Sequence, residues 1–157
     1  MEDTALTVNQ VLLDRMNNMS FRVLWLSPDQ TEAYWIPLNG KRQTPVSFPA
    51  DAVIRDLESG RYALIQDPFS RIDVHPGPTA VRQRDRAWKL ISDIVRMEPA
   101  IYRRHERSAM LKALSEKSGV QVPNLYKLLT RYWKGGMTPN ALLPRYENCG
   151  TGSNPYD

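Results

Sequence analysis

Cysteine and histidine, on which most metal sites and much covalent catalysis depend, are nearly absent from this sequence. Its 157 residues contain one cysteine, Cys149, and two histidines, His75 and His105. These side chains share no ligand spacing, which excludes a four-ligand zinc site, and a single cysteine excludes a disulfide framework within the chain. No histidine lies near Cys149 in sequence to activate a thiolate, and no glycine-rich phosphate loop is present. We therefore predict no active site, metal or cofactor in this chain.

Long apolar runs are also missing, and so is a secretory signal. No apolar stretch is long enough to cross a bilayer, and the first residues, MEDTALTVNQ, lack the basic start and apolar core of a signal peptide. Apolar residues make up 41% of the chain and charged residues 24%, as in ordinary soluble globular proteins. We expect a cytoplasmic protein of one or two domains that does not bind membranes.

Acidic and basic residues are distributed unevenly along the chain. Residues 1–75 carry 7 Lys and Arg against 10 Asp and Glu, whereas residues 76–157 carry 14 against 7. The overall charge of +4 therefore combines an acidic amino-terminal part with a strongly basic carboxy-terminal part. A basic surface neutralises phosphates and releases their counterions, so the second part is the candidate for nucleic-acid binding, with a merely solvated basic face as the alternative.

The amino-terminal part has the pattern of a small, mostly β domain. FRVLWL at 21–26 and EAYWIPL at 32–38 are rich in β-favouring residues, and the turn residues between them predict a hairpin. Asn39-Gly40 supplies a second turn. The following segments predict a short strand at 46–48, a helix at 50–59 stopped by Gly60, and a last strand at 62–66. This order suits a small open barrel.

Proline marks the end of this domain. The segment DPFSRIDVHPGPTAV at 67–81 contains three prolines and a glycine, through which neither a helix nor a strand continues. We therefore divide the chain into a β-rich domain at 1–75, a helical domain with an extended carboxy-terminal arm at 76–150, and a tail at 151–157. The expected fold class is α+β, a barrel-like β domain followed by three helices.

The three helices follow the boundary closely. In the first, apolar residues recur at helical spacing, basic residues fall mostly on other faces, and Glu98-Pro99 ends the helix. The second, at 102–117, closes at Gly119, which suits a left-handed turn residue, and Val120 is expected to plug the corner. The third has Pro123 in its first turn and runs to about residue 133. Its apolar stripe, expected to face the first two helices, is Leu125, Leu128, Leu129 and Tyr132.

The last two helices have the pattern of a helix-turn-helix, whose second helix lies in the major groove of DNA. On this geometry the polar side of the third helix projects outward, where Asn or Gln pairs with adenine, Arg with guanine and Lys with phosphate. A cluster of arginines beside His105 is placed to reach the flanking backbone. The DNA-binding candidates are Gln121, Val122, Asn124, Tyr126, Lys127 and Arg131 on the third helix, and Arg103, Arg104 and Arg107 on the second.

The sequence of the third helix and beyond also resembles a known family. NLYKLLTRYWKGGMTPNALLPRYENCG, at 124–150, is similar to a segment of TnsB transposases, the DDE-type transposases of Tn-seven-like elements. The likeness lies in the YKLL and RYW runs and in the TPNALLP string, followed by Tyr146, Asn148 and Gly150. A weaker likeness covers the rest, because the family has a small β-rich domain, then helix-turn-helix elements, then a catalytic core.

The resemblance implies a function. It implies binding of double-stranded DNA at the repeated sequences of transposon ends, with other transposition proteins as further partners. The family cleaves 3′ ends and transfers strands with a carboxylate-held pair of divalent metals. Its three catalytic acids belong to a ribonuclease-H-like domain that has no counterpart in this sequence, so we expect this chain not to be an enzyme. The long basic linker of the family is missing too, which predicts either the product of a truncated gene or a fragment of a longer transposase.

Two other functions remain open on the sequence. A free-standing transcriptional regulator would use the same helix-turn-helix, normally as a dimer on a palindrome. A protein-interaction adaptor would use the acidic amino-terminal domain, with the basic part only a solvated helical bundle. The candidate DNA contacts have a solvated helix face as their alternative, and Tyr132-Trp133 is expected to close a core.

Overall fold

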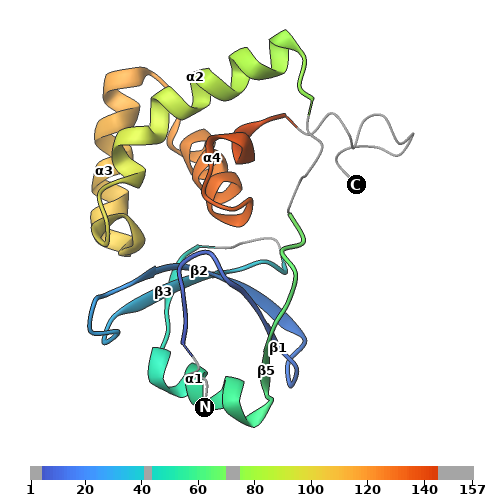
Figure 1. Cartoon of the computed structure of the whole chain (residues 1–157). Helices are drawn as coiled ribbons and strands as arrows, with labels where there is room; N and C mark the ends of the chain where they lie inside the picture. The colour runs from blue at the N-terminus through green and yellow to red at the C-terminus, as the bar shows by residue number, and fades with distance from the viewer. Residues whose placement is uncertain (1–4, 41–43, 70–74, 145–157) are drawn as a thin grey trace.

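A computed structural model describes residues 5–40, 44–69 and 75–144 of the chain. A five-stranded antiparallel sheet forms the amino-terminal part, and the helices of the carboxy-terminal part pack on one side of it (Figure 1). The strands pair in the order β4-β3-β2-β1-β5, so the last strand returns beside the first. The elements are β1 (Val11–Asp14), β2 (Met19–Leu26), β3 (Ala33–Pro37), β4 (Val46–Ser47), α1 (Ala50–Ser59) and β5 (Tyr62–Leu64).

β2 and β3 form the hairpin that the sequence predicts. Leu26 pairs with Ala33 at its end, and Asp29 fixes the turn between the strands. The Asp29 carboxylate accepts hydrogen bonds from the Ser27 hydroxyl at 2.8 Å and from the Thr31 amide at 3.1 Å. Short polar side chains that bond to nearby backbone groups are the usual means of stabilising such turns.

The other segments of this domain are confirmed except for one strand. β4, α1 and β5 lie where the sequence predicts them, to within two residues. α1 ends at Gly60, whose φ of 91° is the left-handed conformation that favours glycine. The sequence pattern does not predict β1, because its apolar run lacks the alternation that indicates a half-buried strand. β1 pairs with both β2 and β5 and is therefore central to the sheet.

The sheet domain has a core of its own, built on stacked aromatic rings. The Trp35 ring lies between those of Phe21 and Phe48, at centroid distances of 4.0 and 4.1 Å. Aromatic side chains bury more apolar area than others, which a domain of this size needs for stability. The buried members of this core are Leu6, Leu12, Val23, Ala33, Trp35, Phe48, Ala50, Val53 and Tyr62.

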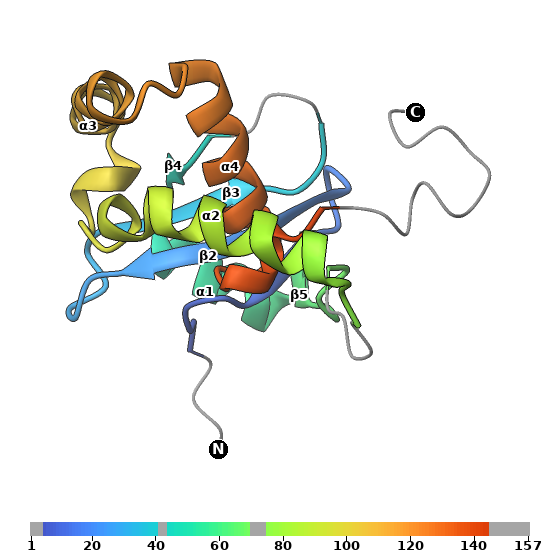
Figure 2. The same cartoon turned by 90° about the horizontal axis from the view of Figure 1, so that it is seen from above.

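The three predicted helices are present, and the third occupies the centre of the helical part. Figure 1 shows α4 between α2 and the sheet, and Figure 2 shows the connection from α3 to α4 at the rear, behind α2. α4 contacts α2, α3, β2 and β3. The elements are α2 (Pro78–Val95), the 3₁₀ turn η1 (Ala100–Tyr102), α3 (Arg104–Ser118), α4 (Val122–Lys134) and the 3₁₀ turn η2 (Pro139–Leu142).

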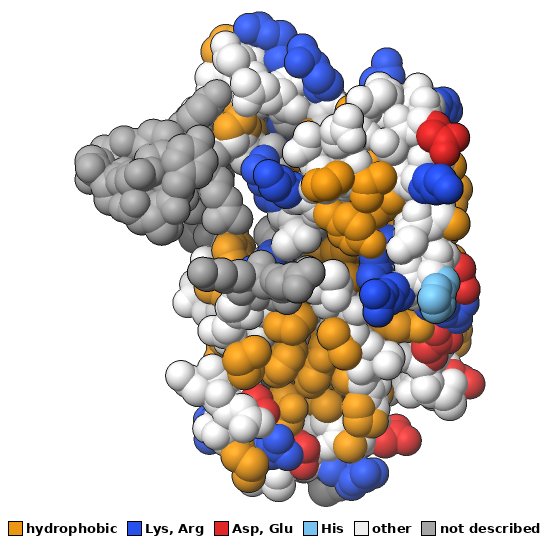
Figure 3. Space-filling view, turned by 180° about the vertical axis from the view of Figure 1, so that it is seen from behind, with side chains coloured by type: hydrophobic (Ala, Val, Ile, Leu, Met, Phe, Trp, Pro, Cys, Tyr) orange, Lys and Arg blue, Asp and Glu red, His pale blue; other side chains and the backbone are white. Residues whose placement is uncertain are grey.

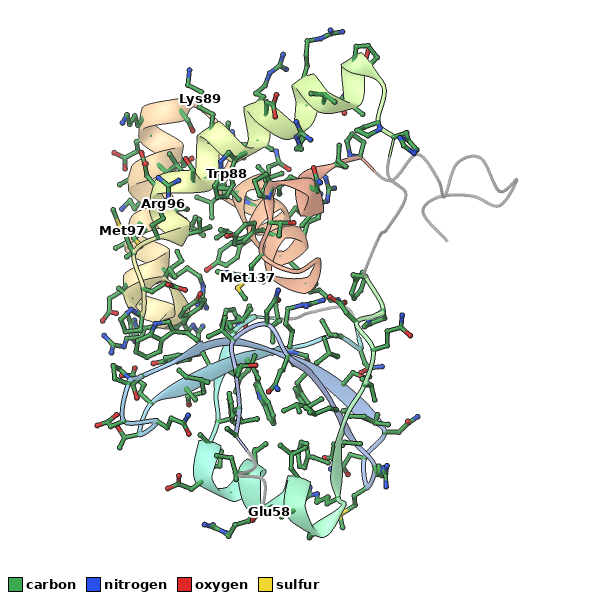
Figure 4. The ribbon with its side chains drawn as sticks, in the orientation of Figure 1. Glu58, Trp88, Lys89, Arg96, Met97 and Met137 are labelled. Carbon is green, nitrogen blue, oxygen red and sulfur yellow. The ribbon has the colours of Figure 1, made fainter. Side chains whose placement is uncertain are left out.

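The sheet and the helices share one hydrophobic core, which we call the shared core. Tyr34 and Ile36 of β3 belong to the same buried cluster as Leu125 and Leu129 of α4. Met137 packs against this cluster and lies between the helices and the sheet (Figure 4). The apolar stripe of α4 therefore faces the sheet as well as the other two helices, which a helix-by-helix reading of the sequence does not reveal.

Arg22 of β2 ties the sheet to the end of α4. Its side chain is 0% exposed, and each of the five N–H groups of a guanidinium finds an acceptor. Nε and Nη2 donate to the Lys134 carbonyl at 3.2 and 3.0 Å, Nη1 donates to two oxygens of Asn9, and Nη2 donates to Asp67 at 2.6 Å. Burial opposes ionisation of Asp67, but the bonds from Arg22 and from the Phe69 amide hold its pKa below the ordinary value.

After α4 the chain turns back on the helices. A Cβ at Gly135 would lie 2.7 Å from the Ala141 Cβ and 2.8 Å from a carbonyl oxygen of α4, so glycine permits η2 to close on this helix. Asn140 accepts a hydrogen bond from Arg84 of α2 at 2.8 Å, and the last residue of η2 is buried in the shared core. The TPNALLP string thus packs against α2 and α4 instead of extending as the predicted arm. Residues 145–157, including the predicted tail, lie outside the described residues.

Candidate nucleic-acid interface

Three residues connect α3 to α4 and set the direction of the second helix. Gly119 ends α3 with a φ of 79°, as its predicted left-handed role requires. Val120 packs against the shared core, and its amide donates to the Ser118 hydroxyl at 3.1 Å. Gln121 is extended, and its carbonyl accepts the first hydrogen bonds of α4 at 3.0 and 3.1 Å. The arrangement is a helix, a tight turn and a second helix.

Only the beginning of α4 is open to solvent. Leu125, Leu129 and Trp133 are buried at four-residue spacing along the helix. Asn124 and Lys127 are exposed, but every residue of α4 after Lys127 is partly or fully buried. The most exposed part of this helix is therefore its amino-terminal end.

The sequence-based candidates on α4 divide into two groups. Some are exposed at the amino-terminal end of the helix: Gln121, Asn124 and Lys127. The others are partly buried: Val122, Tyr126 and Arg131. Val122 and Tyr126 pack against the shared core, so they contribute to stability as well as to the surface.

The exposed end of α4 attracts negative charge. The first amides of a helix lack an intrahelical acceptor, and the helix dipole places partial positive charge around them. The Gln121 side chain, at the N-cap, makes no capping hydrogen bond to these amides. Pro123 has no N–H, and the Asn124 amide donates to the Gln121 carbonyl at 3.0 Å. With Lys127 exposed one turn later, the helix end therefore offers an anionic ligand mainly positive charge.

Arg107 is not at the surface, although the sequence predicts that it contacts the DNA backbone. The side chain is 3% exposed, and its Nη1 donates to the Ile101 carbonyl at 3.2 Å. Its guanidinium carbon lies 5.9 Å from the centre of the Tyr126 ring, and Nε has no hydrogen-bond partner among the described residues. A DNA phosphate cannot reach a guanidinium buried in this way. Arg107 therefore belongs to the packing of α3 against α4, and we remove it from the candidate contacts.

Arg103 forms an ion pair that joins the two domains. Its Nη2 lies 2.8 and 3.1 Å from the two carboxylate oxygens of Glu32, which belongs to the β2–β3 connection. Hydrogen bonds from Tyr34 and from Arg103 hold the pKa of Glu32 below its ordinary value. Arg104 and His105, which follow in the first turn of α3, are exposed. Arg104 therefore retains the placement expected for a backbone contact, whereas Arg103 is shared with the sheet domain.

Basic side chains also lie on α2, where the sequence analysis assigns no contact. Arg82, Arg86 and Lys89 are all exposed. Figure 3, which views the molecule from behind, shows Lys and Arg side chains along the upper edge, at the level of α2, and more acidic side chains around the sheet domain below. The spacing of these residues along the helix is a signal that the sequence already contains.

The described residues offer no sign of another kind of site. Within 5–40, 44–69 and 75–144, no group of three or more His, Cys, Asp and Glu side chains is arranged to hold a metal ion. No helix of these ranges is both long and apolar enough to cross a membrane. His75 and His105 are exposed. Four residues singled out from the sequence lie outside the described residues: Tyr146, Asn148, Cys149 and Gly150.

Two family matches divide the chain at its proline-rich connection. Residues 5–68, which hold the sheet and α1, match the family described as the TnsB N-terminal SH3-like domain. Residues 84–146, which hold α3, α4 and most of α2, match the TnsB second domain. The chain is also 28% identical over 150 residues to the Transposon Tn7 transposition protein TnsB of Escherichia coli. That match covers 91% of this chain and 20% of the relative, so the chain spans about a fifth of the relative's length.

Proposed function

Because this chain belongs to the TnsB family through its two amino-terminal domains, we propose that it binds double-stranded DNA at transposon ends and recognises their sequence. In this proposal α3, the connection after it and α4 act as a helix-turn-helix, with α4 in the major groove. The chain holds DNA during transposition and has no catalytic role of its own. Its place of action is the cytoplasm, and other transposition proteins are its further partners.

The exposed amino-terminal end of α4 is the observation that carries the proposal. Recognition helices contact base edges mainly with their first residues, while the rest of the unit packs against the protein. α4 has this division, because Asn124 and Lys127 are exposed and the helix is partly or fully buried beyond them. A helix that served only as a scaffold would not need polar, uncapped residues at an exposed end.

Each exposed residue of this end has a proposed role. Gln121 and Asn124 carry amides, which pair with the N6 and N7 groups of adenine in the major groove. Lys127 lies one turn further along and contacts a phosphate. Arg104, exposed at the start of α3, contacts the backbone beside the groove. The 14 Lys and Arg against 7 Asp and Glu in residues 76–157 support a polyanionic ligand for this part.

Titration of DNA binding tests the proposal. The chain is titrated against a duplex carrying the element's end repeat and against a scrambled duplex, at low and at moderate salt. Asn124→Ala should weaken binding to the repeat about tenfold or more and leave the scrambled duplex unaffected. Lys127→Ala should weaken binding to both duplexes and lower the salt slope by about one ion. Arg55→Ala, which removes an exposed cation from α1, is the matched control and should change neither.

Three results would contradict the proposal. Equal affinity of the parent chain for both duplexes would show that α4 does not read sequence. Loss of repeat binding in Arg55→Ala as large as that in Lys127→Ala would show that charge alone, and not position, determines affinity. Absence of DNA binding at low salt would instead favour a protein-interaction role for the acidic sheet domain.

A further inference from the structure

We propose that α2 carries a second DNA-contacting surface, formed by Arg82, Arg86 and Lys89, which binds the phosphate backbone next to the site that α4 occupies. We call these three residues the α2 stripe. The inference rests on the proposed function, because it places a duplex on α4 first. It goes beyond that function in predicting a longer contact with DNA than the helix-turn-helix alone would make.

The α2 stripe is a single line of positive charge along the helix. At about 100° per residue, Arg86 lies roughly 40° to one side of Arg82 and Lys89 roughly 20° to the other. All three side chains are exposed, and the Lys89 side chain points away from the sheet in Figure 4. They span roughly 10 Å along the helix axis, the length of about three base-pair steps.

Among the described residues, no ion pair neutralises the charges of the α2 stripe. None of the three takes part in the ion pairs formed by residues 75–144 or by the other described ranges. Arg84, on another side of the same helix, differs in that it is paired with Asp85 at 2.9 Å and bonded to Asn140. Arg82 of the stripe donates to the Thr79 hydroxyl at 3.3 Å, a neutral partner that does not balance its charge. Within one helix, therefore, one arginine is held by an ion pair, whereas the stripe forms none with the described residues.

Packing does not explain the α2 stripe, because α2 buries its other side. Ala80, Ile91, Ile94 and Val95 are the buried residues of this helix. A helix can keep a solvated face with residues of either sign, and mixed charge is usual on such a face. One exposed acid, Asp85, lies within the length of the α2 stripe, and it is paired with Arg84 at 2.9 Å. Asp93 follows near the end of the helix.

The position of α2 relative to α4 indicates duplex DNA as the partner. Figure 2 places α2 in front of the connection that leads into α4, and the Lys89 side chain of α2 points away from the sheet in Figure 4. In this proposal a duplex seated on the exposed end of α4 continues across α2, on the side that Lys89 faces. Its backbone presents one negative charge per strand for each base-pair step, which matches a short row of cations.

Duplex length provides the test. Binding is measured for a short duplex that spans only the α4 site and for one extended by about ten base pairs on each side. Arg86→Ala combined with Lys89→Ala should weaken binding to the long duplex about tenfold at low salt, lower the salt slope by about two ions and shorten the hydroxyl-radical footprint at one end. The same double variant should bind the short duplex as the parent does.

The matched control combines Arg15→Ala with Arg55→Ala, which removes two exposed cations of the sheet domain. This control should bind both duplexes like the parent.

The results separate this inference from the proposed function. The double variant could lose affinity equally for the short and long duplexes, or lose none for either. Each of these results, or an unchanged footprint, would overturn DNA binding by the α2 stripe. A parent chain that prefers the long duplex but ignores its sequence would overturn sequence reading by α4 while supporting the stripe. A sequence preference that is lost in Asn124→Ala, together with unchanged binding in the stripe variant, would support sequence reading by α4 and overturn DNA binding by the α2 stripe.

Discussion

The two ends of α4 are organised in opposite ways. At the carboxy-terminal end, the Lys134 carbonyl accepts hydrogen bonds from fully buried Arg22, and the glycines that follow let η2 close against the helix. At the amino-terminal end, Asn124 and Lys127 are exposed and the N-cap side chain makes no capping bond. One end is fixed by the protein, and the other is exposed to solvent. A recognition helix needs both, since a contact surface is specific only if it is held rigidly.

Arg22→Ala should produce the largest effect on stability, because it acts at the fixed end. The substitution leaves Asp67 and the Lys134 carbonyl without their donor and creates a cavity beneath the shared core. We expect a loss of about 3–5 kcal/mol in the free energy of unfolding, measured with urea. Arg15→Ala, an exposed cation of the same domain, is the control and should change it by less than about 0.5 kcal/mol. A loss below about 1 kcal/mol for Arg22→Ala would contradict the claim that Arg22 fixes the carboxy-terminal end of α4.

Gly135→Ala should have the next largest effect. Its Cβ would meet the Ala141 Cβ at 2.7 Å and the Arg131 carbonyl oxygen at 2.8 Å, so η2 must move away from α4. We expect a loss of about 1–3 kcal/mol in the free energy of unfolding. Gly77→Ala is the matched control, because it lies in open space at a φ of −72°, and its change should stay within about 0.5 kcal/mol. Equal losses in the two variants would show that the close approach of η2 is unimportant.

Acidification should weaken the fixed end more than the exposed end. The pKa of Asp67 lies below its ordinary value of 3.8 in the folded state, so its ionised form stabilises the fold above pH 3.8. That contribution is lost as the pH falls through the lower, folded-state pKa. Unfolding measured between pH 7 and pH 3 should therefore show a steeper loss for the parent than for Asp67→Asn, which lacks the carboxylate at every pH. Parallel pH profiles would contradict the assigned role of the Arg22–Asp67 pair.

Glu32→Gln should have the smallest effect, and it acts on DNA binding. Arg103 is paired with Glu32 at 2.8 Å near the start of α3, where Arg104 is exposed. Removing the carboxylate releases one cation for the backbone and removes one repulsive charge, so affinity for both repeat and scrambled duplexes should rise about threefold at low salt. Relative to the parent, the gain should disappear when Arg103→Ala is combined with it, because the double variant loses the released cation together with the repulsive charge. A gain that persists in the double variant would show that Arg103 does not contact DNA.

The sequence predicts the elements of this fold better than their packing. The hairpin, α1 with its stop at Gly60, and the three helices follow from local patterns of residue type and turn chemistry. The TPNALLP string indicates the TnsB family. The two domain matches confirm this resemblance and the α+β fold class. The structure shows that this string packs η2 against α2 and α4.

The features that the sequence does not predict depend on contacts between residues that lie far apart in the chain. Arg103, Arg104 and Arg107 look alike in sequence, yet the first pairs with the sheet domain, the second is exposed and the third is buried. The β2–β3 hairpin and α4 determine which of these arginines is paired, exposed or buried, and both elements lie elsewhere in the chain. The same holds for Arg22, whose partners come from three separate segments. The exposed start of α4 was predictable, because polar residues there interrupt its apolar stripe.

Reading of an adenine by Asn124 is the most direct test of the central claim, that the exposed end of α4 recognises transposon-end sequence. Each adenine of the repeat is replaced in turn by 7-deazaadenine, which lacks the N7 acceptor of the major groove, and binding of the parent and of Asn124→Ala is measured. We predict one position at which the replacement weakens the parent about tenfold and leaves Asn124→Ala unchanged, as expected when two changes remove the same contact. Additive losses at every adenine, or no loss at any, would contradict recognition by this residue.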